Sequence, residues 1–170
     1  MLPRRLSLLA CTLTALAATP ASARDTLGVF GSWGAFRDYG PTRCIAIAEP
    51  AERLRGGKWR RFAAISYFPD RGIRGQLNIR LRSRKLRGAP VFVTIGEHRF
   101  RLIAGGSDAW APSPRHDAAI VAAMRSGSSM SVETRAADGR AFAEVYRLRG
   151  AATAIDAAAL GCPPRAPRDD

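Results

Sequence analysis

The feature that most constrains the fold is a succession of short segments with the composition of β-strands. Each is rich in β-branched or aromatic residues and is bounded by Gly, Pro or Asp at a turn. We expect strands over residues 27–36, 43–48, 61–68, 75–82, 90–95, 98–103, 129–135 and 140–149. This spacing predicts an all-β fold, either a β-sandwich or a partly closed barrel of short antiparallel strands, with one or two short helices.

Two connections in this pattern have the composition of tight turns. Gly96-Glu97 separates two strand-like segments and predicts a hairpin, and Ala137-Asp138-Gly139 predicts another. In the final strand-like segment Phe142, Val145 and Leu148 do not alternate regularly, which predicts a bulge or a change of register.

Two segments are expected to be helical. "DAAIVAAMR" (117–125) places Ile120, Val121 and Met124 on one side, with Pro114 or Asp117 at its start and Gly127 at its end. Residues 151–160 predict a second, weakly amphipathic helix, and the stretch 105–114 between strands and helix is expected to be a loop.

Residues 1–23 have the organisation of a cleaved signal peptide. A cationic start is followed by an apolar stretch and by Ala21-Ser22-Ala23, the small-x-small pattern that signal peptidase accepts. A lipoprotein box at "LLAC" (8–11) fits less well, because it leaves a very short apolar region before Cys11. We therefore expect a periplasmic or secreted protein of a Gram-negative bacterium, with one domain over 24–162 and a disordered tail over 163–170.

Cleavage after Ala23 would leave Cys44 and Cys162 as the cysteines of the mature chain. Two thiols in an oxidising compartment are expected to form a disulfide, and the alternative is a pair of buried free thiols. Two cysteines and two distant histidines do not have the spacing of a zinc site, and a C-x-x-C redox pair is absent from the sequence.

The clearest candidate for ligand binding is the run "NIRLRSR" (78–84). In a strand, Leu77, Ile79 and Leu81 would face one side, and the arginines would face the other, either as a solvated surface or as an anion-binding stripe. The candidate stripe is Arg80, Arg82 and Arg84, and a second basic patch is Arg53, Arg55, Lys58, Arg60 and Arg61.

The positive charge of the chain extends beyond these two groups. Loss of Arg4 and Arg5 with the leader lowers the formal net charge from +13 to +11. Arginine favours bidentate contact with phosphate, sulfate or carboxylate, although codon usage in a GC-rich genome also raises its frequency. Because an exported protein seldom meets nucleic acid, we expect an anionic envelope component or an envelope or host protein as partner, and no nucleic acid.

Residue patterns that could support catalysis are weak. His116 beside Asp117 and His98 beside Glu97 are candidate acid–base groups, but a polar residue at a helix start is more typical of capping. The serines of 126–131 lack a Gly-x-Ser-x-Gly elbow, and the paired glycines lack the residues of a phosphate loop. We expect no catalytic residue, metal or cofactor.

The C-terminal third resembles a known family. "RHDAAIVAAMRSGSSMSVETRAADGRAFAEVYRLRGAATAIDAA" (115–158) is similar to the closing region of the invasion-associated locus B family of small exported alphaproteobacterial proteins. "FGSWGAF" (30–36) with the later Cys44 resembles the opening of that family. The chain lacks the mid-chain cysteine pair of many members and has Ala151 where phenylalanine is usual. The resemblance implies a β-sandwich in the cell envelope and no established catalytic residues.

The sequence therefore predicts a non-catalytic exported envelope protein that binds an anionic envelope or cell-surface component through arginine. A protein-interaction module acting in host-cell invasion, adhesion or envelope stress resistance is the first alternative. A hydrolase built around His116 or His98 is the second. Trp33, Trp59 and Trp110 would form a carbohydrate-stacking platform only if they converged on the surface, and packing is the commoner role of tryptophan.

Overall fold

The computed structural model describes residues 24–52 and 59–164, which form ten strands and two α-helices. Some of the predictions concern residues outside these ranges. These are the expected signal peptide, Arg53, Arg55, Lys58 and residues 165–170 of the expected tail. The strands are β1 (Arg24–Phe30), β2 (Trp33–Tyr39), β3 (Thr42–Ala48), β4 (Phe62–Phe68), β5 (Ile73–Arg80), β6 (Val91–Ile95), β7 (His98–Gly105), β8 (Asp108–Trp110), β9 (Ser129–Arg135) and β10 (Ala141–Arg147). The helices are α1 (Pro114–Ser126) and α2 (Ala151–Gly161), and a short 3-10 turn spans Pro69–Arg71.

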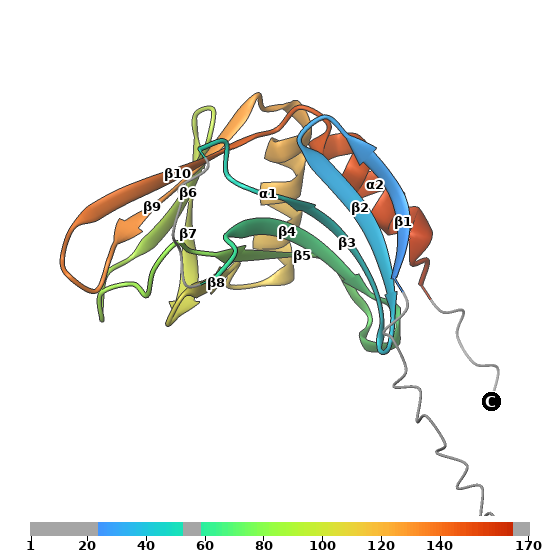
Figure 1. Cartoon of the computed structure of the whole chain (residues 1–170), viewed down its shortest axis with the longest axis horizontal. Helices are drawn as coiled ribbons and strands as arrows, with labels where there is room; N and C mark the ends of the chain where they lie inside the picture. The colour runs from blue at the N-terminus through green and yellow to red at the C-terminus, as the bar shows by residue number, and fades with distance from the viewer. Residues whose placement is uncertain (1–23, 53–58, 165–170) are drawn as a thin grey trace, which may run out of the picture.

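All ten strands belong to one antiparallel sheet in the order β1-β2-β3-β4-β5-β8-β7-β6-β9-β10. The first five strands form a meander, and β8 joins it to the second group (Figure 1). The sheet curves strongly but does not pair β1 with β10, so it is not closed into a barrel. The all-β prediction is confirmed, and the arrangement is sandwich-like.

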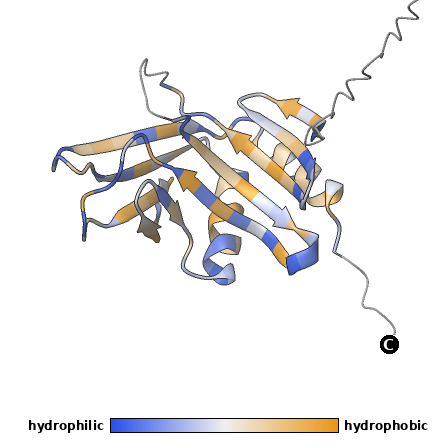
Figure 2. Ribbon diagram, turned by 60° about the horizontal axis from the view of Figure 1, so that its bottom comes forward, coloured by the Kyte–Doolittle hydropathy of each residue, from blue (hydrophilic) through white to orange (hydrophobic). Residues whose placement is uncertain are grey.

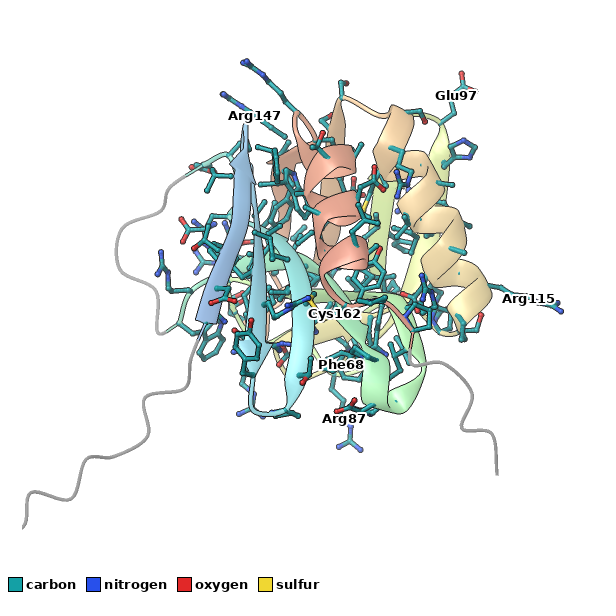
Figure 3. All side chains as sticks on the ribbon, turned by 90° about the vertical axis from the view of Figure 1, so that its right-hand side faces the viewer. Phe68, Arg87, Glu97, Arg115, Arg147 and Cys162 are labelled. Atoms are coloured by element: carbon teal, nitrogen blue, oxygen red, sulfur yellow. A yellow bond between two sulfur atoms is a disulfide. The ribbon has the colours of Figure 1, made fainter. Side chains whose placement is uncertain are left out.

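Both helices cover the same face of the first five strands. Helix α1 packs on β5, whereas α2 packs on β1, β2 and β3, and the two helices lie side by side in Figure 3. Along β5 the buried residues of this face alternate with polar residues on the other face, and Figure 2 shows hydrophilic and hydrophobic residues alternating along strands. Among the fully buried side chains of this face are Trp33, Ile65, Leu77 and Ile79.

Three backbone and side-chain contacts join the two ends of the sheet. The Trp33 Nε1–H donates to the carbonyl of Arg147 at 2.9 Å, and the Ser32 N–H donates to the carbonyl of Arg149 at 3.2 Å. The Ala51 N–H donates to the carbonyl of Val145 at 2.7 Å. The last strand therefore lies against the start of β2 and the segment after β3, although they are about as far apart in sequence as the domain allows.

A disulfide joins Cys44 in β3 to Cys162, the residue after α2, across a sequence separation of 118. Both cysteines are buried, and the bond fits an oxidising compartment. Gly161 lies against this bond: a Cβ there would come 3.2 Å from the Cys44 sulfur and 2.6 Å from Leu27 Cδ1. A small residue is thus needed where the helix end meets β1 and β3.

Several predicted boundaries were wrong for local reasons. Residues 27–36 form two strands rather than one, because Gly31 adopts φ +58° and reverses the chain at Gly31-Ser32. The expected loop 105–114 contains β8, a three-residue strand held by cross-strand pairing with β5 and β7. Of the two starts predicted for helix α1, Pro114 is confirmed, since the helix begins there after the cap residue Ser113.

The prediction of a bulge or a change of register in the final strand was also wrong. Strand β10 pairs with β9 in a continuous register, and register shifts lie instead in the β1–β2 and β4–β5 pairs. Phe142, Glu144 and Tyr146 face inward, whereas Val145 is 45% exposed. The apolar residues misled the prediction because a charged residue, Glu144, occupies an inward position.

We predict that loss of the disulfide destabilises the fold without changing it. Replacing both cysteines by alanine should lower the free energy of unfolding by ~4–5 kcal/mol, since a loop of this length adds much conformational freedom to the unfolded chain. Denaturant unfolding of the two proteins measures the difference. Equal midpoints, or a wild-type midpoint insensitive to reductant, would contradict this role.

We predict a severe effect of Gly150→Ala. Gly150 precedes α2 at φ +88°, and a Cβ there would lie 1.8 Å from the carbonyl oxygen of Phe30. Gly139 is the matched control, because it has φ +85° but nothing within 4 Å of its Cβ position. Gly139→Ala should cost roughly 1–2 kcal/mol from backbone strain alone, and Gly150→Ala roughly 3 kcal/mol or more. Equal losses in thermal or denaturant unfolding would show that the contact with Phe30 is unimportant.

Candidate anion-binding surface

The predicted alternation around β5 is present. Leu77, Ile79 and Leu81 are completely buried, and Arg80 projects from the opposite face of the strand. Strand β5 ends at Arg80, so Arg82 and Arg84 continue the alternation in the segment that follows it. Both of these arginines are exposed.

Arg80 is held by one carboxylate and one aromatic ring. Its Nε donates to Asp108 Oδ1 at 2.6 Å, across the β5–β8 pair. Its guanidinium carbon lies 5.8 Å from the centre of the Phe62 ring, on the neighbouring strand β4. With a side chain 34% exposed, Arg80 is a positioned cation rather than a freely solvated one.

Arg82 and Arg84 lie in a segment that is fixed by backbone hydrogen bonds. The Leu81 N–H donates to the carbonyl of Ser107 at 2.8 Å, and the Ala137 N–H donates to the carbonyl of Arg84 at 2.9 Å. The guanidinium of Arg82 stacks on Phe142 of β10, 4.6 Å from its ring centre. The segment after β5 therefore carries these two cations from the first half of the sheet to its last strand.

The second predicted patch is anchored by a buried ion pair. Arg61 Nη1 donates to Glu144 Oε1 at 3.1 Å, and Nη2 donates to the carbonyl of Glu52 at 2.9 Å. The side chains of Arg61 and Glu144 are only 14% and 1% exposed. Burial raises the pKa of the Glu144 carboxyl, and its contact with Arg61 offsets that rise in part.

The two predicted arginine groups meet in the fold. Phe62, which supports Arg80, directly follows Arg61, and Phe142, which supports Arg82, lies two positions before Glu144. The indole N–H of Trp59 donates to the carbonyl of Leu81 at 2.7 Å and ties the two segments together. We call Arg60, Arg80, Arg82 and Arg84, with the mostly buried Arg61 as their anchor, the joined arginine surface. Arg53, Arg55 and Lys58 of the second patch lie outside the described residues.

A groove of about 840 Å³ opens beside this surface, on the face of β1–β4 opposite the helices. Among its lining residues are four arginines, Arg24, Arg60, Arg61 and Arg147, and one acid, Glu49. Arg60 pairs with Glu49 at 2.5 Å, but its side chain is 89% exposed. Sequence reasoning did not find Arg24 or Arg147, because they are distant in sequence and border one groove only where β10 lies against the start of β2.

Arg24 is part of a small charge network at the edge of β1. Its Nε donates to Asp38 Oδ1 at 2.6 Å, and Arg43 Nη2 donates to the other oxygen at 2.7 Å. Hydrogen bonding from Arg24 lowers the pKa of the Asp38 carboxyl, burial opposes this, and Arg43 adds to the lowering. Arg24 therefore shares one carboxylate with Arg43, whereas Arg147 has no ion pair among the described residues.

The residues considered for catalysis do not converge. Ser113 Oγ accepts from the His116 N–H and lies 2.8 Å from His116 Nδ1, so His116 belongs to the cap of α1. Asp117 turns inward instead, where its Oδ1 accepts from the Leu77 N–H at 2.7 Å. His98 is exposed and stacks against Phe100. Trp33 is fully buried, which removes it from any surface stacking platform.

Two further searches concern the described residues only. Within 24–52 and 59–164, no group of three or more His, Cys, Asp or Glu side chains could hold a metal ion. In the same ranges no helix is long and apolar enough to cross a membrane. Comparison of the chain with protein-family models, curated proteins and solved structures finds no significant match.

We predict that pH changes the contributions of two aspartates to stability in opposite directions. The two are Asp117 in α1 and Asp156 in α2. Burial raises the pKa of Asp117, and the Leu77 hydrogen bond and the charge of His116 offset this in part. A raised pKa means that the folded state prefers the protonated carboxyl, so stability is lost as pH rises through it. Asp117→Asn should therefore gain stability relative to wild type as pH rises from 3 to 7.

Asp156 is the matched control because its pKa is lowered, chiefly by hydrogen bonding from Arg125, with burial opposing. Its contribution is present above the ordinary carboxyl range and is lost as pH falls. Asp156→Asn should therefore lose stability relative to wild type over the same rise in pH, by a small amount because the pair is exposed. Denaturant midpoints across pH measure both differences, and equal signs would contradict the assignment.

Proposed function

We propose that this chain is an exported, non-catalytic envelope protein that binds an anionic component through the joined arginine surface. The observation that carries the proposal is the meeting of two arginine groups, from residues 60–61 and 80–84, around Phe62 and Phe142. A cluster assembled from separate strands presents several guanidinium groups to one ligand, which a single stripe along one strand does less well.

The way these arginines are held supports binding rather than simple solvation. Stacking on Phe142 restricts Arg82, and less side-chain freedom is lost when it binds a phosphate, sulfate or carboxylate. Arg60 is paired only with Glu49 at an exposed site, and such pairs contribute little, so an incoming anion competes easily. Arg53, Arg55 and Lys58 stay predictions from the sequence, because they lie outside the described residues.

Export and family membership belong to the same proposal. The leader-like residues 1–23 and the Cys44–Cys162 disulfide support a periplasmic or secreted location. The resemblance of residues 115–158 to the invasion-associated locus B family supports an envelope role. A non-catalytic role is supported by the separation of His116, whose N–H and ring contact the cap residue Ser113, from Asp117, which faces the core.

We predict that binding of the mature protein to isolated Gram-negative envelope fractions weakens as salt rises. The variant Arg82→Gln/Arg84→Gln should bind about tenfold more weakly at low salt, because a hydrogen bond to a charged group contributes roughly 1.5–3 kcal/mol. It should also flatten the dependence on salt. Adding Arg80→Gln should weaken binding further and flatten the dependence on salt further. Folding of this triple variant is verified, because Asp108 loses its hydrogen-bond partner.

The control is Arg74→Gln/Arg115→Gln, which removes the same charge from two exposed arginines, one near the start of β5 and one in α1. Equal weakening in both double variants would reduce the effect to net charge and overturn the assignment. Binding that is insensitive to salt would favour the protein-interaction module, which uses apolar surface.

A further inference from the structure

The groove on the open face of β1–β4 combines charge with exposed apolar surface. Val29 of β1, Gly34 of β2 and Ile47 of β3 lie in one cross-strand row, since Val29 pairs with Gly34 and Gly34 with Ile47. All three line the groove. Val29 is 70% exposed although it is a large apolar residue, which leaves part of the row uncovered.

Aromatic side chains border this apolar row. The Phe36 ring leans over Gly34, with its Cε2 atom 2.7 Å from the position that a Cβ would take, so a larger residue at 34 would displace the ring. Phe62 of β4 lines the groove from the other side. A half-open channel with an aliphatic floor and aromatic borders is typical of sites that hold apolar parts of small ligands.

The rim of the groove is cationic. Arg60 and Arg147 line it from the segment before β4 and from the end of β10, and Figure 3 shows Arg147 near one end of β1. Arg60 has one exposed partner, Glu49, and Arg147 has no ion pair among the described residues. The backbone of Arg147 is fixed, because its carbonyl accepts from the Trp33 indole N–H at 2.9 Å.

We propose that this groove binds a single-chain anionic amphiphile, with its alkyl chain along Val29 and Ile47 and its phosphate or carboxylate head at Arg60 and Arg147. The proposal rests on the proposed function and specifies its ligand class. Charge complementarity selects an anionic head, because Arg60 and Arg147 are exposed at the rim, whereas Arg24 and Arg61 of the lining are paired with Asp38 and Glu144. The apolar floor selects a chain, because a simple anion would leave Val29 in water. The volume of about 840 Å³ lies within the range of small-molecule sites.

The test is calorimetric titration of the mature protein with inorganic phosphate and with butyl, octyl and dodecyl phosphate, each below its micelle concentration. Affinity should rise by roughly twofold to fourfold for each added methylene, the upper value being the full burial of one CH₂ at ~0.8 kcal/mol. Octyl glucoside, which has the same chain and no charge, should bind at least about tenfold more weakly than octyl phosphate, since a hydrogen bond to a charged group contributes roughly 1.5–3 kcal/mol.

Two pairs of variants separate the chain from the head. Val29→Ser should reduce the dependence on chain length, and its control Val145→Ser, at an exposed valine outside the groove, should not. Arg60→Gln and Arg147→Gln should each weaken all alkyl phosphates by a similar factor, and Arg74→Gln should not. Folding of each variant is checked by thermal unfolding, and all five substituted side chains are exposed.

Three results would overturn the proposal: affinity independent of chain length, equal binding of octyl glucoside and octyl phosphate, or equal loss in Val29→Ser and Val145→Ser. If any of these occurs while Arg82→Gln/Arg84→Gln still weakens salt-sensitive binding to envelope fractions, the groove assignment fails and the proposed function stands. If binding to envelope fractions is also absent, both fail.

Discussion

The arrangement of this sheet depends on one buried ion pair, Arg61 with Glu144. It joins the start of β4 to the last strand, β10, and its side chains are almost completely removed from water. A buried carboxylate without a partner would be costly, so the pair favours the packing in which the two strands meet. Around it lie Phe62 and Phe142, the rings that support Arg80 and Arg82. The position of the arginine surface therefore follows from how the two ends of the sheet come together.

A strongly basic chain must also limit repulsion among its own cations. Many arginines contact either a carboxylate or an aromatic ring. Asp38 accepts hydrogen bonds from both Arg24 and Arg43, and Asp108 accepts from Arg80. The Phe68 ring contacts the guanidinium groups of Arg43 and Arg71. Among the described residues seven acids pair with arginine, and exposed arginines such as Arg82, Arg84 and Arg147 form no ion pair there. The contact between the Arg82 guanidinium and the Phe142 ring keeps this cation oriented without neutralising it, which is the property that an anion-binding surface needs.

Local patterns predicted most strands because alternation reports directly on a half-buried sheet. Leu77, Ile79 and Leu81 face the core as their spacing indicates, and the Gly96-Glu97 turn joins β6 to β7. The failures share a physical cause. Strand β8 is too short to have a pattern of its own and exists through its pairing with β5 and β7. In β10 the inward position of Glu144 is possible only because Arg61, 83 residues away, supplies its partner. Gly31 reverses the chain where composition alone reads as one continuous strand.

The sequence by itself determined the all-β class and the two groups of arginines, because periodicity and local composition are properties of neighbouring residues. It predicted the Cys44–Cys162 disulfide from the cysteine count, with free thiols as the alternative, and the structure has the disulfide. Only the tertiary structure decided that the two arginine groups form one surface, and that Arg24 and Arg147 border the same groove as Arg60. These are contacts between residues distant in sequence, set by how the curved sheet brings β10 against the segments around β2 and β4. No local pattern encodes these long-range contacts, because they result from the summed packing and hydrogen bonding of the whole sheet.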